Sequence, residues 1–250
     1  MMLQRLTARI KSQDWFAVAL ELAVVIIGIF LGLQADSWNR ARIAKADLDD
    51  YLQALSQELA NTVDIRERQI RWENAVVDGL KLTLGALDVT SLDPKQRDDA
   101  YDALVNLPNP PTFVQKTAIL REMQAEGMLR PVQNQELRQG LGEIISLADA
   151  QQAEYTRYVA RISAPQYSAA VVRYGMGADG RVTVVDIDTD AASSDPAFRQ
   201  QLWQGIPAYQ DVAHLNELAV KLQLEVLGML ADEGFRPSEN WLLEKSRVNK

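Results

Sequence analysis

The feature that most constrains this chain is an apolar run of 21 residues near its N-terminus, from Trp15 to Ala35 (WFAVALELAVVIIGIFLGLQA). A helix rises about 1.5 Å per residue, so about 20 apolar residues match the hydrocarbon thickness of a bilayer. The only charged residue in the run is Glu21, and no later run approaches this length. The mean hydropathy of the whole chain is −0.17. The sequence therefore predicts one transmembrane helix attached to a domain of about 200 residues outside the membrane.

The residues that flank the run favour an uncleaved anchor over a secretory signal peptide. A signal peptide also opens with basic residues, and this chain has three of them before the run. The apolar core of a signal is usually only about 7–15 residues long, however, and cleavage after Ala35 would need a small residue where Leu33 stands. We therefore expect a short tail over residues 1–14 and a retained transmembrane helix over 15–35.

The orientation of the span is nearly balanced by the positive-inside rule, because three basic residues precede it and three follow it closely. The short N-terminal tail and the acidic segment that starts at Asp47 favour a cytoplasmic N-terminus. We expect the C-terminal domain to lie in the periplasm or outside the cell. Trp15 and Trp38 stand at the two ends of the span, where aromatic side chains anchor a helix to the membrane interfaces.

One face of the predicted transmembrane helix combines its only charge with small residues. At about 100° per residue, Gly28 and Gly32 fall within about 20° of Glu21. A G-x-x-x-G pair lets two helix backbones approach closely, and a carboxyl group inside a bilayer usually has a partner. The alternative is a chance alignment, since glycine is common in membrane helices. We favour a docking face, which comprises Glu21, Val25, Gly28, Gly32, Ala35 and Asn39.

A long amphipathic helix is predicted directly after the span, over residues 36–87. Residues of one stripe recur there in steps of three or four from Leu48 to Leu84, although the stripe is polar at Arg66 and Glu73. No strong helix breaker separates this helix from the span. One continuous helix and a bend near Asn39 are therefore both compatible with the sequence.

Proline, glycine and aspartate mark the boundaries of the remaining elements. Asp93 and Pro94 are typical of a helix N-terminus. Gly127 is expected to end a helix, and Pro207 is expected to precede the last one. The predicted helices cover residues 94–107, 112 or 113–126, 131–162, a segment that starts at 195–196, and 208–233, and the predicted strands cover 168–174 and 181–187.

The predicted fold is mainly α, with a transmembrane helix followed by an extended up-and-down helical bundle and a small β-hairpin. The bundle would occupy residues 36–234 with the hairpin at about 168–188, and a tail would follow over 235–250. We expect Trp241 in this tail to pack back on the domain or to bind a partner. The buried face of the last helix is expected to comprise Leu215, Leu218, Leu222, Val226 and Met229.

Charge and cysteine content exclude several classes of function. Outside the first 35 residues the chain has 23 basic and 32 acidic residues, and the net charge of the whole chain is −8. Nucleic-acid binding needs clustered lysine and arginine, so no nucleic-acid partner is expected. The absence of cysteine removes thiolate nucleophiles, disulfides and cysteine-based metal sites.

No catalytic motif emerges from the remaining polar residues. His214 is the only histidine, and we expect it to pack in its helix rather than to act as a base. Asp186, Asp188 and Asp190 have the spacing of a calcium loop, but alanine replaces its glycine and its glutamate, so a solvated turn is expected. The mixed charges of residues 66–71 are expected on a salt-bridged surface. We therefore expect no enzyme activity, no cofactor and no metal.

The span and the residues just after it also resemble a family. The segment ELAVVIIGIFLGLQADSWN, from Glu21 to Asn39, is similar to the start of a widespread set of uncharacterised bacterial proteins. Those proteins open with a span of the form E-L-x-x-V-V-x-G-x-F-x-G-x-Q, followed by W-N and a helical domain. The segment from Ile119 to Arg130 resembles a turn of the same family. The resemblance implies a single-pass protein of the bacterial inner membrane, and it brings no catalytic residue.

Two functions fit these features. In the first, the chain is a membrane-anchored, non-catalytic accessory protein that docks through its transmembrane helix to itself or to a larger membrane protein complex. Its partners would be membrane lipid and another membrane protein. In the second, the helical domain is an extracytoplasmic sensory or ligand-binding module whose pocket would use Tyr155, Tyr158 and Trp203.

Overall fold

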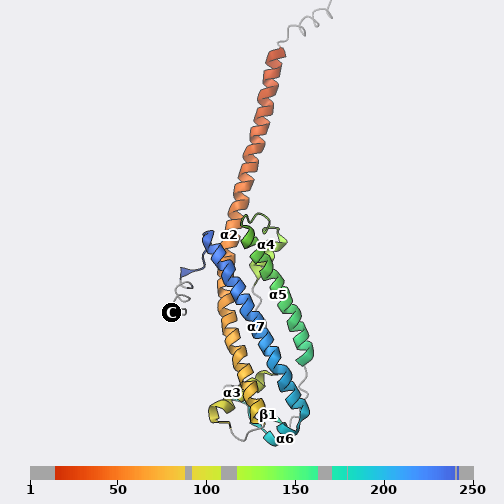
Figure 1. The fold of residues 1–250 in the computed structure, drawn as a ribbon. Helices are drawn as coiled ribbons and strands as arrows, with labels where there is room; N and C mark the ends of the chain where they lie inside the picture. The colour runs from red at the N-terminus through yellow and green to blue at the C-terminus, as the bar shows by residue number, and fades with distance from the viewer. Residues whose placement is uncertain are drawn as a thin grey trace, which may run out of the picture. The chain divides into compact units, whose positions relative to one another are not determined.

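The computed structural model of the protein describes residues 15–87, 92–107, 117–162, 171–178, 180–239 and 241. The chain divides into two compact units, Met1–Asp50 and Tyr51–Lys250. The described residues form six helices and one two-stranded sheet (Figure 1), which confirms the mainly α fold with a small hairpin. In chain order the elements are α2 (Trp15–Ala86), α3 (Pro94–Asn106), α4 (Ala118–Ala125), α5 (Gln135–Ile162), β1 (Val172–Met176), β2 (Val182–Ile187), α6 (Thr189–Ser194) and α7 (Pro196–Asp232).

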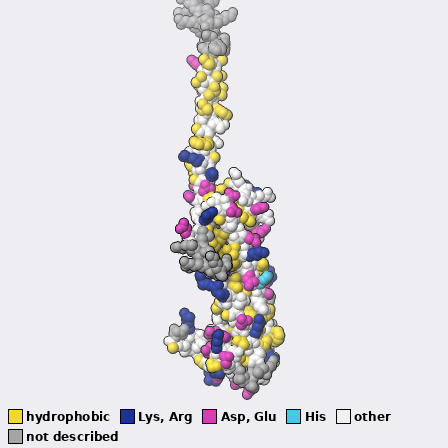
Figure 2. Space-filling view, turned by 60° about the vertical axis from the view of Figure 1, so that its left-hand side comes forward, with side chains coloured by type: hydrophobic (Ala, Val, Ile, Leu, Met, Phe, Trp, Pro, Cys, Tyr) yellow, Lys and Arg dark blue, Asp and Glu magenta, His cyan; other side chains and the backbone are white. Residues whose placement is uncertain are grey.

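The described part of the first unit is the N-terminal portion of α2. Helical structure continues through Asn39 without interruption. Hydrophobic side chains cover this portion of the helix in Figure 2. Among the described residues, α2 is the one helix that is long and apolar enough to cross a bilayer, and none of its apolar window is buried. The predicted span is therefore supported by length, composition and exposure.

The second unit is built around three long helices that lie side by side, namely α2 from Tyr51 onward, α5 and α7 (Figure 1). Most of the stripe predicted on α2 is buried, including Leu52, Leu55, Leu59 and Leu80, whereas Ile70 and Leu84 are only half-buried. α5 and α7 bury aliphatic stripes of their own and pack against each other. Removing apolar surface from water contributes about 25 cal/mol per Å², so these stripes supply the main force that holds the helices together.

One end of the bundle is closed by α3, the β-hairpin and α6. Their apolar side chains join those of α2 and α7 in one cluster that contains the fully buried Phe198 and Tyr209. The Tyr209 hydroxyl donates to the carbonyl oxygen of Asn106 at 2.7 Å. α2 and α3 approach so closely that a Cβ on Gly79 would collide with the Asp99 carbonyl. Glycine is therefore required at residue 79 for the space it leaves.

The start of α3 confirms the predicted cap. The Asp93 carboxylate accepts the Gln96 N–H at 2.9 Å, and the Gln96 side chain accepts the Asp93 N–H at 3.1 Å. Pro94 occupies the first turn, where its missing N–H costs nothing. Local sequence was sufficient here because both partners lie within four residues of each other.

The hairpin forms with a shifted first strand. β1 and β2 pair antiparallel with Val172 opposite Ile187. The prediction began the first strand at residue 168, but residues 163–170 lie outside the described part of the chain. The predicted end of this strand at residue 174 is wrong, because β1 continues through Gly175 to Met176. Gly180, with φ of +77°, takes the left-handed conformation that the turn requires.

Two helix starts were predicted too early. The prediction of one helix from 112 or 113 to 126 is wrong, because Thr117 is not helical and α4 begins at Ala118. α5 begins at Gln135 rather than at Pro131, since the Asn134 side chain caps it by accepting the Leu137 N–H at 3.1 Å. The end of α4 is as predicted, with Gly127 at φ +74°.

The start of α4 is capped from a distant part of the chain. The Thr117 side chain makes no capping hydrogen bond. Instead, the Glu58 carboxylate of α2 accepts the N–H groups of Ala118 at 2.7 Å and Ile119 at 2.9 Å. A carboxylate at a helix N-terminus satisfies free N–H groups and interacts favourably with the helix dipole. Glu58 therefore ties α4 to the side of α2.

The predicted break at Pro207 is wrong, because α7 runs through it from Pro196 to Asp232. A proline inside a helix removes one hydrogen bond and frees the carbonyl four residues earlier. That carbonyl belongs to Trp203, which is 63% exposed, and Pro207 itself is exposed, so water can satisfy the freed oxygen. The adjacent Ile206 and Tyr209 are buried, and their packing offsets the loss.

The buried face of α7 also differs from the prediction. Leu218 is 44% exposed, and Leu215 and Leu222 are only half-buried. From residue 212 onward the buried positions are Val212, Ala213, Asn216, Ala219, Gln223, Val226, Leu227 and Leu230. A rule that places the leucines inside therefore rotates this part of the helix away from its true orientation, because two of its buried residues are the amides Asn216 and Gln223.

The described part of the tail packs back on the domain. The Gln53 amide of α2 donates to the carbonyl oxygen of Arg236 at 2.8 Å, and the Gln57 side chain accepts the Ser238 N–H at 2.9 Å. Trp241 is buried. Of the two predictions made for Trp241, packing on the domain is the one that the structure supports.

We predict that Glu58→Ala lowers the free energy of unfolding of the second unit by about 1–2 kcal/mol, because two N–H groups of α4 lose their acceptor. Urea titration of the full chain in detergent measures this. Glu225→Ala, at an exposed position of α7, is the matched control and should change stability by less than about 0.5 kcal/mol. Equal effects of the two substitutions would contradict the capping role.

Candidate functional site

The predicted docking face lies on the exposed surface of the first unit. Val25 is 56% exposed, and the other members of the face, Glu21 and Ala35 included, are also exposed. At Gly28 and Gly32 an added Cβ would meet nothing within 4 Å among the described residues. This differs from Gly79, where internal packing requires glycine. The described part of the chain therefore gives no internal reason for two glycines on this face.

Polar groups gather at the C-terminal end of the span. Trp38 is 71% exposed, and the Arg42 guanidinium lies 6.0 Å from the centre of its ring. Asp36 and Arg40 form an ion pair at 2.6 Å, and the side-chain Oδ1 of Asn39 accepts a long hydrogen bond of 3.4 Å from Arg42. An amphipathic ring beside charged groups suits the interface between lipid and water. The side chain of Trp15 lies outside the described part of the structure.

A second candidate site lies inside the second unit, where α2, α5 and α7 share a layer of buried polar side chains. We call Arg66, Glu73, Gln151 and Asn216 the polar layer; each is at most 2% exposed. Arg66 donates from Nη1 to Asn216 Oδ1 at 2.7 Å and from Nη2 to Gln151 Oε1 at 3.2 Å. Gln151 in turn donates to the carbonyl oxygen of Leu215 at 3.1 Å. The guanidinium thus binds both neighbouring helices.

The carboxylate of the polar layer is held by amides. Asn216 donates from Nδ2 to both Glu73 oxygens, at 3.1 and 3.2 Å, and Gln69 donates to Glu73 Oε1 at 3.1 Å. Asn216 therefore connects Arg66 to Glu73 with both ends of one amide. Its orientation is determined by this pair, since the oxygen faces the cation and the nitrogen faces the carboxylate.

Burial changes the acidity of both charged groups in the polar layer. Burial raises the pKa of Glu73 from its ordinary 4.5 to about 7, while hydrogen bonds from Gln69 and Asn216 and the charge of Arg66 act in the opposite direction. Burial also lowers the pKa of Arg66 to about 10, against the attraction of Glu73. Arg66 therefore stays charged at neutral pH, whereas Glu73 titrates near it.

The expectation that residues 66–71 form a salt-bridged surface is wrong for Arg66, which is buried, although Arg68 and Arg71 are exposed. The sequence carried a signal for this. Arg66 and Glu73 lie two helical turns apart on the stripe of α2 that also contains buried leucines such as Leu59 and Leu80. The missing information was the identity of the amides that face them, since Gln151 and Asn216 are far away in sequence.

Two predicted roles of single residues need correction or refinement. His214 does not pack inside; its side chain is 68% exposed, with Nδ1 3.9 Å from a Glu217 oxygen. Ala213, the preceding residue, is buried, but consecutive residues of a helix point in directions about 100° apart, so His214 faces solvent. The aspartates with calcium-loop spacing act separately, because Asp186 in β2 pairs with Arg173 at 3.1 Å and Asp188 caps α6 by accepting the Ala191 N–H at 2.9 Å.

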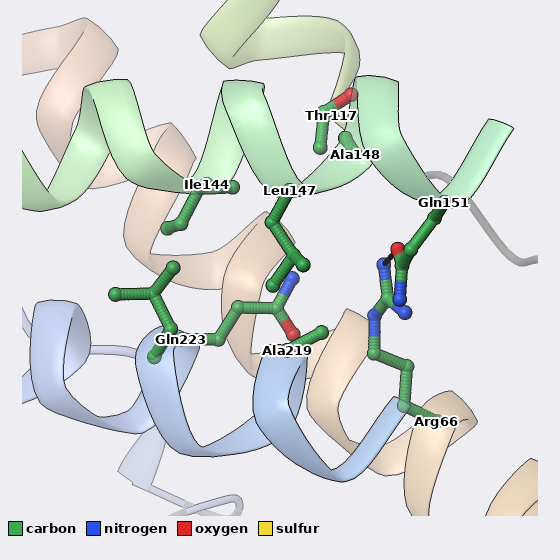
Figure 3. Close-up of a pocket in the computed structure, with 9 residues that line it drawn as sticks. Arg66, Thr117, Ile144, Leu147, Ala148, Gln151, Ala219 and Gln223 are labelled. Atoms are coloured by element: carbon green, nitrogen blue, oxygen red, sulfur yellow. Dashed lines mark hydrogen bonds between the residues drawn. The ribbon is translucent and has the colours of Figure 1, made fainter. Parts of the chain in front are cut away.

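A small pocket adjoins the polar layer between α2, α5 and α7 (Figure 3). Arg66, Gln151 and Gln223 line it together with apolar side chains. The aromatic residues proposed for a ligand pocket are not among the lining residues; Trp203 is largely exposed, and the side chain of Tyr158 lies outside the described part. Among the described residues, no three or more His, Cys, Asp or Glu side chains converge in a way that could hold a metal ion.

We predict that Glu73→Gln removes a pH-dependent loss of stability. Because the folded-state pKa of Glu73 lies above its ordinary value, the native state binds the proton more tightly than the unfolded state. Its contribution to stability is therefore fully present below about pH 4.5 and declines as the pH rises to about 7. The advantage of the variant should grow across this window, to an order of 1–3 kcal/mol at pH 8.

Urea titrations of the full chain at a series of pH values measure the difference between wild type and Glu73→Gln. Glu225→Gln, at an exposed position of α7, is the matched control and should leave the pH profile unchanged. A constant difference between wild type and Glu73→Gln from pH 4 to pH 8 would show that Glu73 does not titrate in this window.

Comparisons of the chain with protein-family models, curated proteins and solved structures gave no match. The resemblance of the span to a bacterial membrane-protein family accordingly stays a prediction. The function of the protein has to be inferred from its own residues and their geometry.

Proposed function

We propose that this protein is a membrane-anchored, non-catalytic accessory protein that docks through its transmembrane helix to itself or to a larger membrane protein complex. The observation that carries the proposal is the docking face itself. Glu21, Gly28 and Gly32 share one exposed side of an apolar helix, and the two glycines are open to any approaching helix.

The physical argument begins with the cost of placing such a helix in lipid. An ionisable group among hydrocarbon chains is unfavourable by several kcal/mol unless a polar partner or water reaches it. A second helix that approaches over Gly28 and Gly32 would supply close backbone packing and could bring a hydrogen-bond partner to Glu21. Docking would therefore lower the free-energy cost of placing the Glu21 carboxyl group in lipid, and it would allow close packing of helix backbones at Gly28 and Gly32.

The buried polar layer supports a structural rather than a catalytic role for the domain. Arg66 and Glu73 are at most 2% exposed, and the pocket beside Arg66 holds only about one water molecule, which is too little for a substrate. Their hydrogen bonds instead join three helices. A stiff helical domain on a membrane anchor suits a scaffold or accessory subunit.

We place the protein in a bacterial inner membrane, with the N-terminus in the cytoplasm and the domain in the periplasm. The short N-terminal tail and the acidic residues after the span support this orientation, and Trp38 and Arg42 suit the outer interface. Residues 1–35 would be the anchor segment, and residues 36–250 would form the periplasmic portion.

Gly28→Leu should disrupt the docked complex, because a leucine side chain on this face keeps the helix backbones apart. We expect the full chain, extracted in mild detergent, to migrate in native gels at a lower mass than the wild type. Glu21→Leu should weaken the complex as well.

Ala23→Leu is the matched control for Gly28→Leu, since residue 23 lies about 160° from Glu21 on the helix and the change also adds bulk. It should leave the complex intact. If Gly28→Leu and Ala23→Leu behave alike, the docking face is not the contact surface.

The orientation predicts which sites a membrane-impermeant maleimide can reach. The chain has no native cysteine, so one introduced cysteine gives one label. Lys221→Cys, at an exposed position of α7, should label in spheroplasts, whereas Ser12→Cys should label only after the membrane is opened. The reverse pattern would place the domain in the cytoplasm.

A further inference from the structure

The pocket beside the polar layer contains two buried polar atoms of opposite character. Arg66 is 2% exposed and Gln223 is 1% exposed, and both line the pocket. Within the described residues, neither the Nε–H of Arg66 nor the Oε1 of Gln223 has a hydrogen-bond partner. One is a donor and the other an acceptor. Buried polar groups in folded proteins nearly always have partners, so this pair points to a ligand.

The other hydrogen-bonding nitrogens of Arg66, and the side chain of Gln151, are already engaged. Both Nη atoms of Arg66 donate to amide oxygens, one on Asn216 and one on Gln151. Gln151 also uses its own nitrogen, which donates to the Leu215 carbonyl. Figure 3 shows Arg66 and Gln151 facing each other, and Gln223 extending toward them from α7 beside Ala219. Arg66 Nε therefore offers a donor, and Gln223 Oε1 an acceptor, to whatever occupies the pocket.

The size and polarity of the pocket identify the class of ligand. The space holds about one water molecule, and most of the remaining wall consists of apolar side chains such as Ile144 and Leu147, with the hydroxyl-bearing Thr117 beside them. A metal cation would be repelled by the Arg66 charge, and an anion would place negative charge against the Gln223 oxygen. A neutral molecule that both accepts and donates a hydrogen bond satisfies the two atoms together.

We propose that this pocket is a binding site for one internal water molecule, which accepts a hydrogen bond from Arg66 Nε and donates one to Gln223 Oε1. The water extends the polar layer by another link between α2 and α7. Each of the three nitrogens of the guanidinium then has a partner, namely Asn216, Gln151 and the water. The site lies wholly in the second unit and does not depend on the docking of the span.

A crystal structure of the full chain in a lipid phase, at a resolution that resolves ordered water, tests the site. We expect a density peak within about 2.7–3.2 Å of both Arg66 Nε and Gln223 Oε1. A side chain of Gln223 turned so that its oxygen binds a protein group would overturn the proposal. So would the absence of a peak, or a peak with the anomalous scattering of chloride.

A pair of variants provides a second, matched test. Gln223→Met keeps the length of the side chain and removes the acceptor, so the density beside Arg66 Nε should disappear or move. Gln201→Met makes the same change at another buried glutamine of α7, whose Oε1 also has no partner among the described residues but which does not line this pocket. Its density beside Arg66 should match that of the wild type. An unchanged peak in Gln223→Met would show that Gln223 does not hold the water.

Discussion

The burial of one cation, Arg66, is the constraint on which the second unit depends. Removing a charge from water costs several kcal/mol even after relaxation, so a buried guanidinium must be surrounded by acceptors. Asn216 and Gln151 provide them from α7 and α5. Because these bonds are directional, the sliding of any one helix by a turn would break them. The polar layer thereby fixes the register of helices whose aliphatic stripes alone would tolerate several offsets.

Glu73 gives the same layer a dependence on pH. Asn216 links its carboxylate to the cation, and burial places its pKa at about 7. Protonation changes the charge of the layer while the hydrogen-bonding amides stay in place. The three-helix core is thus held by apolar burial for strength and by a titratable polar layer for register.

Small and polar residues have internal neighbours in the second unit but face open space in the described part of the first unit. In the domain, the space at Gly79 is occupied by the neighbouring helix, and the charge of Arg66 is matched by internal amides. On the span, Gly28 and Gly32 face open space and Glu21 lies on the same exposed side. The proposed docking of this face to a partner in the membrane would give these small residues a close neighbour.

Much of the fold follows from short-range chemistry, and the failures arise where distant residues decide. Asp93 and Pro94 predicted the start of α3 because a cap needs only its own first turn. The start of α4 was missed since its cap, Glu58, lies about 60 residues earlier. The break predicted at Pro207 failed because burial of its neighbours outweighs one lost hydrogen bond.

The polar layer shows the same limit at the level of the site. Sequence periodicity placed Arg66 and Glu73 on the buried stripe of α2, yet their charge argued for the surface. Only the partners resolve that conflict, and Asn216 is 150 residues away from Arg66. The leucines of α7 misdirected the prediction in the same way, because its inner face is partly built from amides. The docking face, by contrast, rests on local helical geometry alone, and it stays a prediction.

A cysteine crosslinking scan in native membranes tests whether one side of the predicted span contacts another membrane helix, as we propose. The cysteine-free chain allows each residue from Ala19 to Ala35 to be replaced in turn. We expect crosslinking to a second copy or to a membrane protein to be strongest at 21, 25, 28, 32 and 35, with a helical period of about 3.6 residues. Crosslinking that is uniform along the span, or strongest on the opposite side at Ala23 and Phe30, would contradict it.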